Sequence, residues 1–210
     1  MREEYTRQLE LLNNELTQMG GLIESAIANA VKALDGDEHA MNKAYDYEKD
    51  INRTEKEIEN LCLKLVLTQQ PVATDLREIS AALKMITDME RIGDQAEDIA
   101  EIAATSKSQP YMEQSKYIQR MAAATIDMVD KSISAFIKKD LLIVDEVINS
   151  DDVVDALFED VKNELVDAIR NNTVDGNVLD ILMVAKYFER IGDHAVNIAE
   201  WVRFSITGEL

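Results

Sequence analysis

The chain has 210 residues and a formal net charge of −19, from 41 acidic and 22 basic residues. Such a surface repels nucleic-acid phosphates and anionic lipid headgroups, which excludes both as direct partners and favours cations or basic protein surfaces. The sequence has 46% hydrophobic residues but only 2 prolines and 7 glycines, a composition typical of a helical protein with a substantial core. No signal-peptide pattern and no apolar run approaching about 20 residues is present, so we expect a cytoplasmic protein without membrane insertion.

Apolar residues recur at spacings of three and four along nearly the whole chain, which predicts long helices. The first is expected to end near Gly36, the second at Pro71, and Thr74 or Asp75 should cap the third. The first helix should be about thirty residues long. The next four should cover residues 37–70, from the cap at Thr74 or Asp75 to about 106, 111–139 and 141–171, and the sixth should end near 206. A loop is expected over 105–110 and a turn over 171–176. Short connections make consecutive helices antiparallel neighbours.

The two halves of the chain repeat one another. The pentapeptide ERIGD occurs at 90–94 and again at 189–193, and residues 83–101 share ten identities in nineteen with residues 182–200. Typical residue frequencies would give about one identity by chance. We therefore predict an all-α fold of two tandem antiparallel three-helix bundles related by internal duplication, covering residues 1–107 and 108–210.

The expected third helix carries an acidic stripe beside its core stripe. The acids lie at helical spacing, with Asp98 beside them: Glu90, Asp94, Glu97 and Glu101. The expected second helix has a matching polar face formed by Glu48, Asn52, Glu55 and Glu59. An antiparallel hairpin sets Glu48 level with Asp94, and in the second half it sets Asp151 level with Asp193 and Asp155 level with Glu189. The sequence therefore predicts one oxygen-rich cluster in each half.

Crowded carboxylates suit hard cations such as Mg²⁺, Mn²⁺, Ca²⁺ or ferric iron, because no thiolates for softer metals are available. The alternative is a solvated acidic face, which is the commonest role of charged residues on helices. No phosphate-binding glycine loop, no Ser/His/Asp set and no Glu-x-x-His pair on two helices occurs, so we expect a protein that is not an enzyme.

Each ERIGD places a glycine inside a helix, where it costs about 1 kcal/mol relative to alanine. Gly93 and Gly192 fall between the core stripe and the acidic stripe. A close crossing of a neighbouring helix, or space for a bound ion, would explain both glycines.

The two clusters are expected to differ in strength. In the second half Val196 and Asn197 replace Glu97 and Asp98, and Phe158 and Lys162 stand at the positions of Glu55 and Glu59. Affinity for hard cations follows the number and charge of oxygen ligands, and the Lys162 ammonium should oppose cation entry in the second half. The first-half site should therefore bind more tightly.

The doubled ERIGD-x-A-x-x-I, together with Met19-Gly20 and Glu24 and with Gln70-Pro71 before Asp75-Leu76-Arg77, resembles the PhoU family over nearly the whole chain. The resemblance implies two three-helix bundles related by a pseudo-twofold axis. It also implies polynuclear metal sites at E(D)xxxD motifs, with iron or zinc in some members and manganese or magnesium as further candidates. The candidate ligands are Glu48, Asn52, Glu90, Asp94, Asp98, Asp151, Asp155, Glu189, Asp193 and Asn197. Asn52 departs from the motif and weakens one ligand set.

The resemblance further implies a cytoplasmic regulator that restrains phosphate uptake by the phosphate-specific ABC transporter and passes the phosphate signal to a sensor histidine kinase. The expected partners are therefore the transporter ATPase subunit and the kinase, together with a second copy of the chain in a homodimer. The alternative is a cation-binding or storage bundle whose carboxylates are themselves the function.

Overall fold

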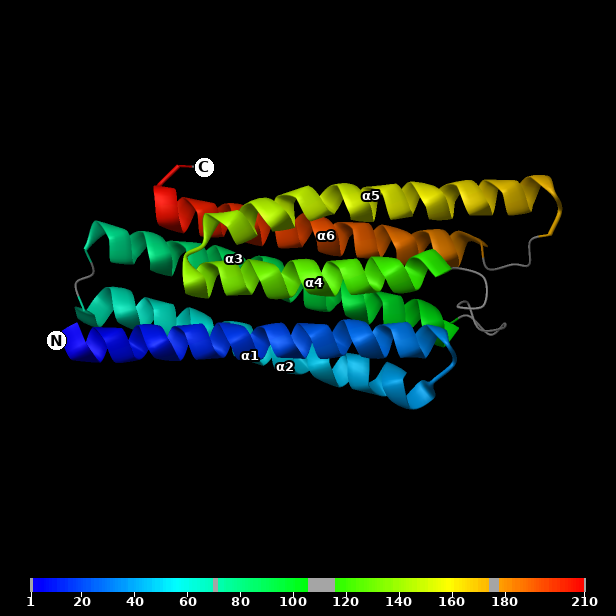
Figure 1. The fold of residues 1–210 in the computed structure, drawn as a ribbon. Helices are drawn as coiled ribbons and strands as arrows, with labels where there is room; N and C mark the ends of the chain where they lie inside the picture. Colours follow the sequence, from blue (N-terminus) through cyan, green and yellow to red (C-terminus); the bar gives the residue numbers. More distant parts are fainter. Residues whose placement is uncertain (1, 70–71, 106–115, 174–177, 210) are drawn as a thin grey trace.

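The computed structural model describes residues 2–69, 72–105, 116–173 and 178–209, and these form two antiparallel three-helix bundles lying side by side (Figure 1). The helices of the described ranges are α1 (Arg2–Leu34), α2 (Glu38–Gln69), α3 (Ala73–Thr105), α4 (Lys116–Lys138), α5 (Leu141–Arg170) and α6 (Val178–Thr207). Their boundaries lie close to those predicted. The predicted loop beyond 105, the 107/108 boundary, Pro71 and the end of the 171–176 turn lie outside the described residues.

Three helix starts are fixed by acidic side chains. Asp37 Oδ1 accepts the backbone N–H groups of His39 and Ala40 at 2.9 and 3.0 Å, and Asp140 Oδ1 accepts that of Leu142 at 2.9 Å. Both aspartates occupy the N-cap position, where such bonds satisfy otherwise unpaired N–H groups. Asp75 differs from the expected cap, because it reaches back from inside the first turn of α3.

Asp75 Oδ2 accepts the N–H of Val72 at 3.3 Å, and the carbonyl of Val72 accepts the N–H of Leu76 at 2.9 Å. Val72 is therefore the N-cap, and Asp75 supplies the backward bond of a capping box. The N-cap therefore lies two or three residues before the expected Thr74 or Asp75.

The two bundles meet along α3 and α6, and α1 contacts α4 in the same interface. In Figure 1, α2 and α5 lie at opposite outer edges of the molecule, each packed beside the third helix of its own half. Fully buried apolar residues of all six helices form one continuous core, for example Leu16, Ile51, Met89, Met128, Val154 and Phe188. The repeat therefore produces matching α2–α3 and α5–α6 hairpins, which carry the predicted clusters.

None of the helices in the described ranges contains a segment long and apolar enough to cross a membrane.

Candidate functional site

The first carboxylate cluster lies between α2 and α3, as the antiparallel hairpin predicts. Burial raises the pKa of Glu90, as do the nearby carboxylates of Asp94, Glu55 and Glu48, while the Arg91 guanidinium lowers it. The side chain of Glu90 is 20% exposed and that of Asp94 is 31% exposed. These acids are thus half-buried against the neighbouring helix, in contrast to a fully solvated face.

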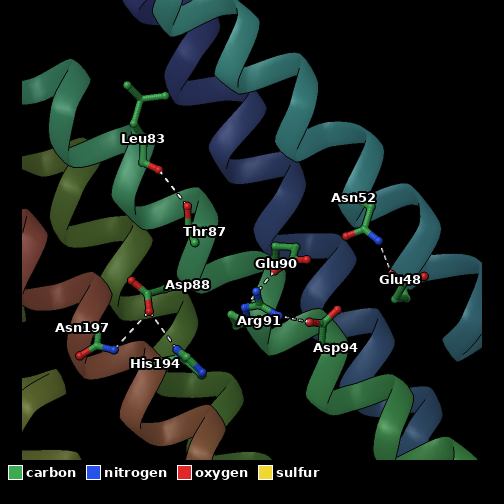
Figure 2. Close-up of polar contacts among 10 residues, drawn as sticks. All are labelled: Glu48, Asn52, Leu83, Thr87, Asp88, Glu90, Arg91, Asp94, His194 and Asn197. Atoms are coloured by element: carbon green, nitrogen blue, oxygen red, sulfur yellow. Dashed lines mark hydrogen bonds and ion pairs between the residues drawn. The ribbon is translucent and has the colours of Figure 1, made fainter.

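Neighbouring polar groups already engage this first cluster (Figure 2). Arg91 NH1 lies 2.9 Å from Asp94 Oδ2, and Arg91 Nε lies 3.5 Å from Glu90 Oε2. On α2, the Asn52 side-chain amide donates a hydrogen bond to Glu48 Oε1. Arg91 and Asn52 therefore offset part of the repulsion among the acids.

The second cluster lies between α5 and α6. Burial raises the pKa of Asp151 to about 6, with further contributions from the carboxylates of Asp155, Asp193 and Glu189. These four acids are the predicted second-half set, and the structure brings them together. Burial and neighbouring negative charges disfavour the charged form of an acid, and a bound cation would favour it.

Glycine permits close helix contact at both clusters. A Cβ atom at position 93 would lie 3.1 Å from Ile51 Cδ1, and one at position 192 would lie 3.4 Å from Val154 Cγ1 and 3.1 Å from Asp151 Oδ1. Ile51 and Val154 occupy equivalent positions of the two repeats. The close helix crossing predicted from the sequence is therefore present in both halves, and Gly192 additionally leaves space beside a carboxylate oxygen.

Asp98 and Asn197, the remaining predicted ligands, are engaged at the interface between the halves. The Tyr187 hydroxyl donates a hydrogen bond to Asp98, whose pKa is raised chiefly by burial. Asn197 Nδ2 donates to Asp88 Oδ1 at 3.2 Å (Figure 2). These two contacts are equivalent under the repeat, because residue 98 corresponds to 197 and residue 88 to 187.

Asp88 and His194 are site-adjacent residues that sequence reasoning missed. Asp88 Oδ1 lies 2.9 Å from His194 Nδ1, and the two side chains are 15% and 20% exposed. His194 is thus half-buried in the α3–α6 interface and not on a free helix surface. A signal was present in the sequence, since a polar residue at 88 sits one helical turn from the core position Ile92 on a face that must meet another helix.

The donor set fits a hard cation, although side chains must move to bind one. Carboxylates from two helices lie near one another in each half, with the Asn52 amide beside Glu48 in the first, and the space beside Gly192 adjoins Asp151 Oδ1. Among the described residues, no three Asp, Glu, His or Cys side chains are already arranged to hold one ion. Binding therefore requires new rotamers for carboxylates now paired with basic or amide groups, and the ligand roles stay predictions.

An internally duplicated six-helix protein with carboxylates between the second and third helices of each half is the class that this fold defines. The PhoU domain matches this sequence twice, over residues 16–103 and 118–202. The chain belongs to the PhoU family. The matches fall on the two bundles and include every predicted ligand.

Relatives extend along the whole chain. The phosphate-specific transport system accessory protein PhoU homolog of Clostridium acetobutylicum is 35% identical over 99% of this chain and 96% of its own length. The accessory protein PhoU of Escherichia coli K12 is 27% identical over 98% of this chain and 86% of its own length.

Two crystal structures share the fold. PhoU from Pseudomonas aeruginosa has a TM-score of 0.85 and 31% identity, covering 98% of this chain and 100% of that protein. The phosphate transport system regulatory protein PhoU from Streptococcus pneumoniae has a TM-score of 0.88 at 22% identity, covering 98% of each chain, which supports the fold alone.

Proposed function

We propose that this protein is a non-enzymatic, metal-binding regulator of phosphate uptake and phosphate-responsive signalling. The principal support is family membership over both bundles, since the relatives are named as accessory proteins of the phosphate-specific transport system. In this proposal the protein acts by contact with the ATPase subunit of the phosphate ABC transporter and with a sensor histidine kinase.

Charge supports a contact mechanism of this kind. The net charge of −19 favours association with basic protein surfaces and raises encounter rates with them. The six long helices, packed in two antiparallel bundles, also offer extended faces for docking. The chain works in the cytoplasm, where both partners present their soluble domains.

Metal ions complete the proposed site. Glu48, Asn52, Glu90 and Asp94 would hold a divalent or trivalent ion in the first half, and Asp151, Asp155, Glu189 and Asp193 would do so in the second. Such an ion would neutralise the crowded carboxylates. Each residue set spans two helices. A bound ion would therefore link α2 to α3 and α5 to α6, and this link would stabilise the docking surface.

Co-purification with the transporter ATPase subunit tests the regulatory role. The full chain, purified without affinity tag or chelator, is passed over immobilised ATPase subunit, with an unrelated acidic helical protein as the charge control. We expect specific retention of the chain only. A chain that carries metal but is not retained would support the storage alternative, in which the carboxylates are the function.

Metal analysis of the same preparation tests the other half of the proposal. We expect bound iron, zinc, manganese or magnesium, with loss of thermal stability on chelation and recovery on addition of the metal, because a ligand that binds only the folded state stabilises it by mass action. Protein that carries no metal, and whose melting temperature changes neither on chelation nor on addition of metal, would contradict the metal role. The co-purification experiment would still decide whether the protein binds the transporter.

A further inference from the structure

One ammonium group, on the 45% exposed side chain of Lys186, contacts a carboxylate of the second cluster. Lys186 Nζ is 2.5 Å from Glu189 Oε2, and the Glu189 side chain is only 16% exposed. The same Nζ lies 5.6 Å from the centre of the Phe158 ring on α5. A half-buried carboxylate and an aromatic face are both groups that attract a cation, and here one lysine satisfies both.

The first cluster has no counterpart to this arrangement. Thr87 occupies the position equivalent to Lys186, and its hydroxyl donates to the Leu83 carbonyl at 3.3 Å within α3 (Figure 2). Glu55 occupies the position equivalent to Phe158, and it contributes negative charge near Glu90. The ammonium and its aromatic contact therefore belong to the second half alone.

Lys162, expected from the sequence to oppose cation entry, has a different partner. Its Nζ lies 2.6 Å from Glu159 Oε1 within α5. Both side chains of that pair are about half exposed, at 49% and 56%. The positive charge that meets the predicted ligands is thus on Lys186, three residues before Glu189 on α6.

We propose that Lys186 is a tethered competitor for the cation of the second site, held in place by Glu189 and the Phe158 ring. The inference rests on the proposed metal-binding function. A metal ion that uses Glu189 must displace the ammonium from the carboxylate, because both positive charges seek the same oxygens and repel each other at short range. In the metal-free protein the ammonium neutralises Glu189, and it is released to solvent when the ion arrives.

The competition makes the two sites unequal in a defined way. The first site needs the rearrangement of Arg91, which is 56% exposed, and of the Asn52 amide that donates to Glu48. The second site must break the Lys186–Glu189 pair, whose ammonium also lies over the Phe158 ring. Loss of such a partly exposed pair corresponds to a change of about twofold to fivefold in ion affinity.

The test isolates the second site in the full chain. In a background that carries Glu90→Gln and Asp94→Asn, Mn²⁺ binding to chelator-stripped protein is measured by titration calorimetry. Lys186→Thr, which copies the first half, and Lys186→Gln, which replaces the ammonium by a neutral amide, should each tighten Mn²⁺ binding about twofold to fivefold. Two neutral variants are used so that the result does not depend on the folding of either one.

Two controls remove the general effect of charge. Lys162→Thr deletes an ammonium that lies on Glu159 and should change Mn²⁺ affinity by less than about twofold, since a solvated charge is screened. Lys186→Arg keeps the positive charge and should bind Mn²⁺ no more tightly than the background. Equal tightening by Lys162→Thr and Lys186→Thr would overturn the proposal, because removal of any nearby charge would then suffice.

The outcomes separate this inference from the proposed function. Mn²⁺ binding by the background that is unchanged in both neutral Lys186 variants overturns the competitor role alone. Absence of Mn²⁺ binding from the wild type, the background and both neutral variants overturns the metal-binding function and this inference with it. Binding that appears or tightens only when Lys186 is neutral supports it.

Discussion

The two halves share a backbone but manage their acids differently. Arg91 stays beside the acids of its own ERIGD, where it pairs with Glu90 and Asp94. In the second half, Lys186 pairs with Glu189, while Arg190 acts on Asp98 of the other bundle, where it opposes part of the rise in pKa that burial causes. The two copies of the ERIGD pentapeptide therefore share the same helix crossing but differ in their charge contacts.

The cause lies outside the motif. A glycine contact depends on the backbone, which the repeat preserves, so Gly93 and Gly192 meet Ile51 and Val154 in the same way. A charge contact depends on which side chain lies one turn away. Lys186 places an ammonium on Glu189, whereas Thr87, at the equivalent position, carries no charge. In this chain, the duplicated motif consequently predicts helix packing better than it predicts the ion pairs around it.

The largest expected effect comes from filling the two glycine contacts. Gly93→Leu and Gly192→Leu should each lower the free energy of unfolding by about 2 kcal/mol after the gain in helix propensity, because the first added carbon is already at tight contact distance. In a chain of this size the melting temperature should fall by roughly 4–8 °C. Thermal melts by circular dichroism measure the change.

Gly21→Leu is the matched control for these variants. Gly21 also lies inside a helix, but a Cβ there would meet no atom within 4 Å. This substitution should raise stability by up to about 1 kcal/mol through helix propensity. If Gly93→Leu and Gly192→Leu raise the melting temperature as Gly21→Leu does, the close helix crossings do not contribute to stability.

The next effect concerns the ligands of the two sites. Glu90→Gln with Asp94→Asn should abolish the tighter phase of a Mn²⁺ titration, whereas Glu189→Gln with Asp193→Asn should abolish the weaker phase. The first cluster has more acids and no ammonium equivalent to Lys186, so we expect its affinity to be about tenfold higher, or about 1.4 kcal/mol. Calorimetric removal of the tighter phase by the second pair would reverse the ranking.

A smaller effect is expected at the α3–α6 interface. Asp88→Ala leaves the His194 and Asn197 contacts without their acceptor and should cost about 1 kcal/mol, measured by urea denaturation. Asp98→Ala at the equivalent contact should cost less, since burial already disfavours the charged form of Asp98. Equal losses at the two positions would mean that the repeat symmetry outweighs the chemical difference.

The smallest expected effect is a pH dependence from Asp151. Its pKa rises from 3.8 to about 6 in the folded protein, so the folded state binds the proton more tightly and loses stability as pH rises across that window. Solvent screening keeps the change below about 1 kcal/mol. Melts of chelator-treated protein from pH 4 to 7 should show the decline, and Asp151→Asn should flatten it.

The matching behaviour of the first cluster sharpens this comparison. Burial also raises the pKa of Glu90, but the Arg91 guanidinium opposes that shift. Glu90→Gln should therefore flatten the pH profile less than Asp151→Asn does. A larger flattening by Glu90→Gln would place the stronger carboxylate coupling in the first half.

Much of the fold could be predicted because its determinants are local. Helix ends follow from Gly36 and from the apolar spacing, and the repeat fixes which helices form hairpins, whereas the expected cap at Thr74 or Asp75 was wrong. The proximity of Glu55 to Glu90 also follows, since hairpin register sets the levels of facing residues. The structure agrees with these predictions, and the metal-ligand roles stay predictions.

The missed features depend on packing between the halves or on rotamer choice. Asp88 and His194 are 106 residues apart, and their contact exists only because α3 lies against α6. Lys162 and Lys186 could each have met the acids of the second cluster, and only side-chain rotamers decide that Lys186 does. Spacing along one helix carries neither kind of information.

The antiparallel pairing of α3 with α6 also has an evolutionary consequence. A single three-helix repeat that met a second copy of itself through this face would make the contact between residues 88 and 98 twice, and any mutation would alter both copies together. Two repeats joined in one chain are free of that constraint. One contact is now Asp98 with Tyr187 and the other is Asp88 with Asn197, so each can change while its twin is left intact.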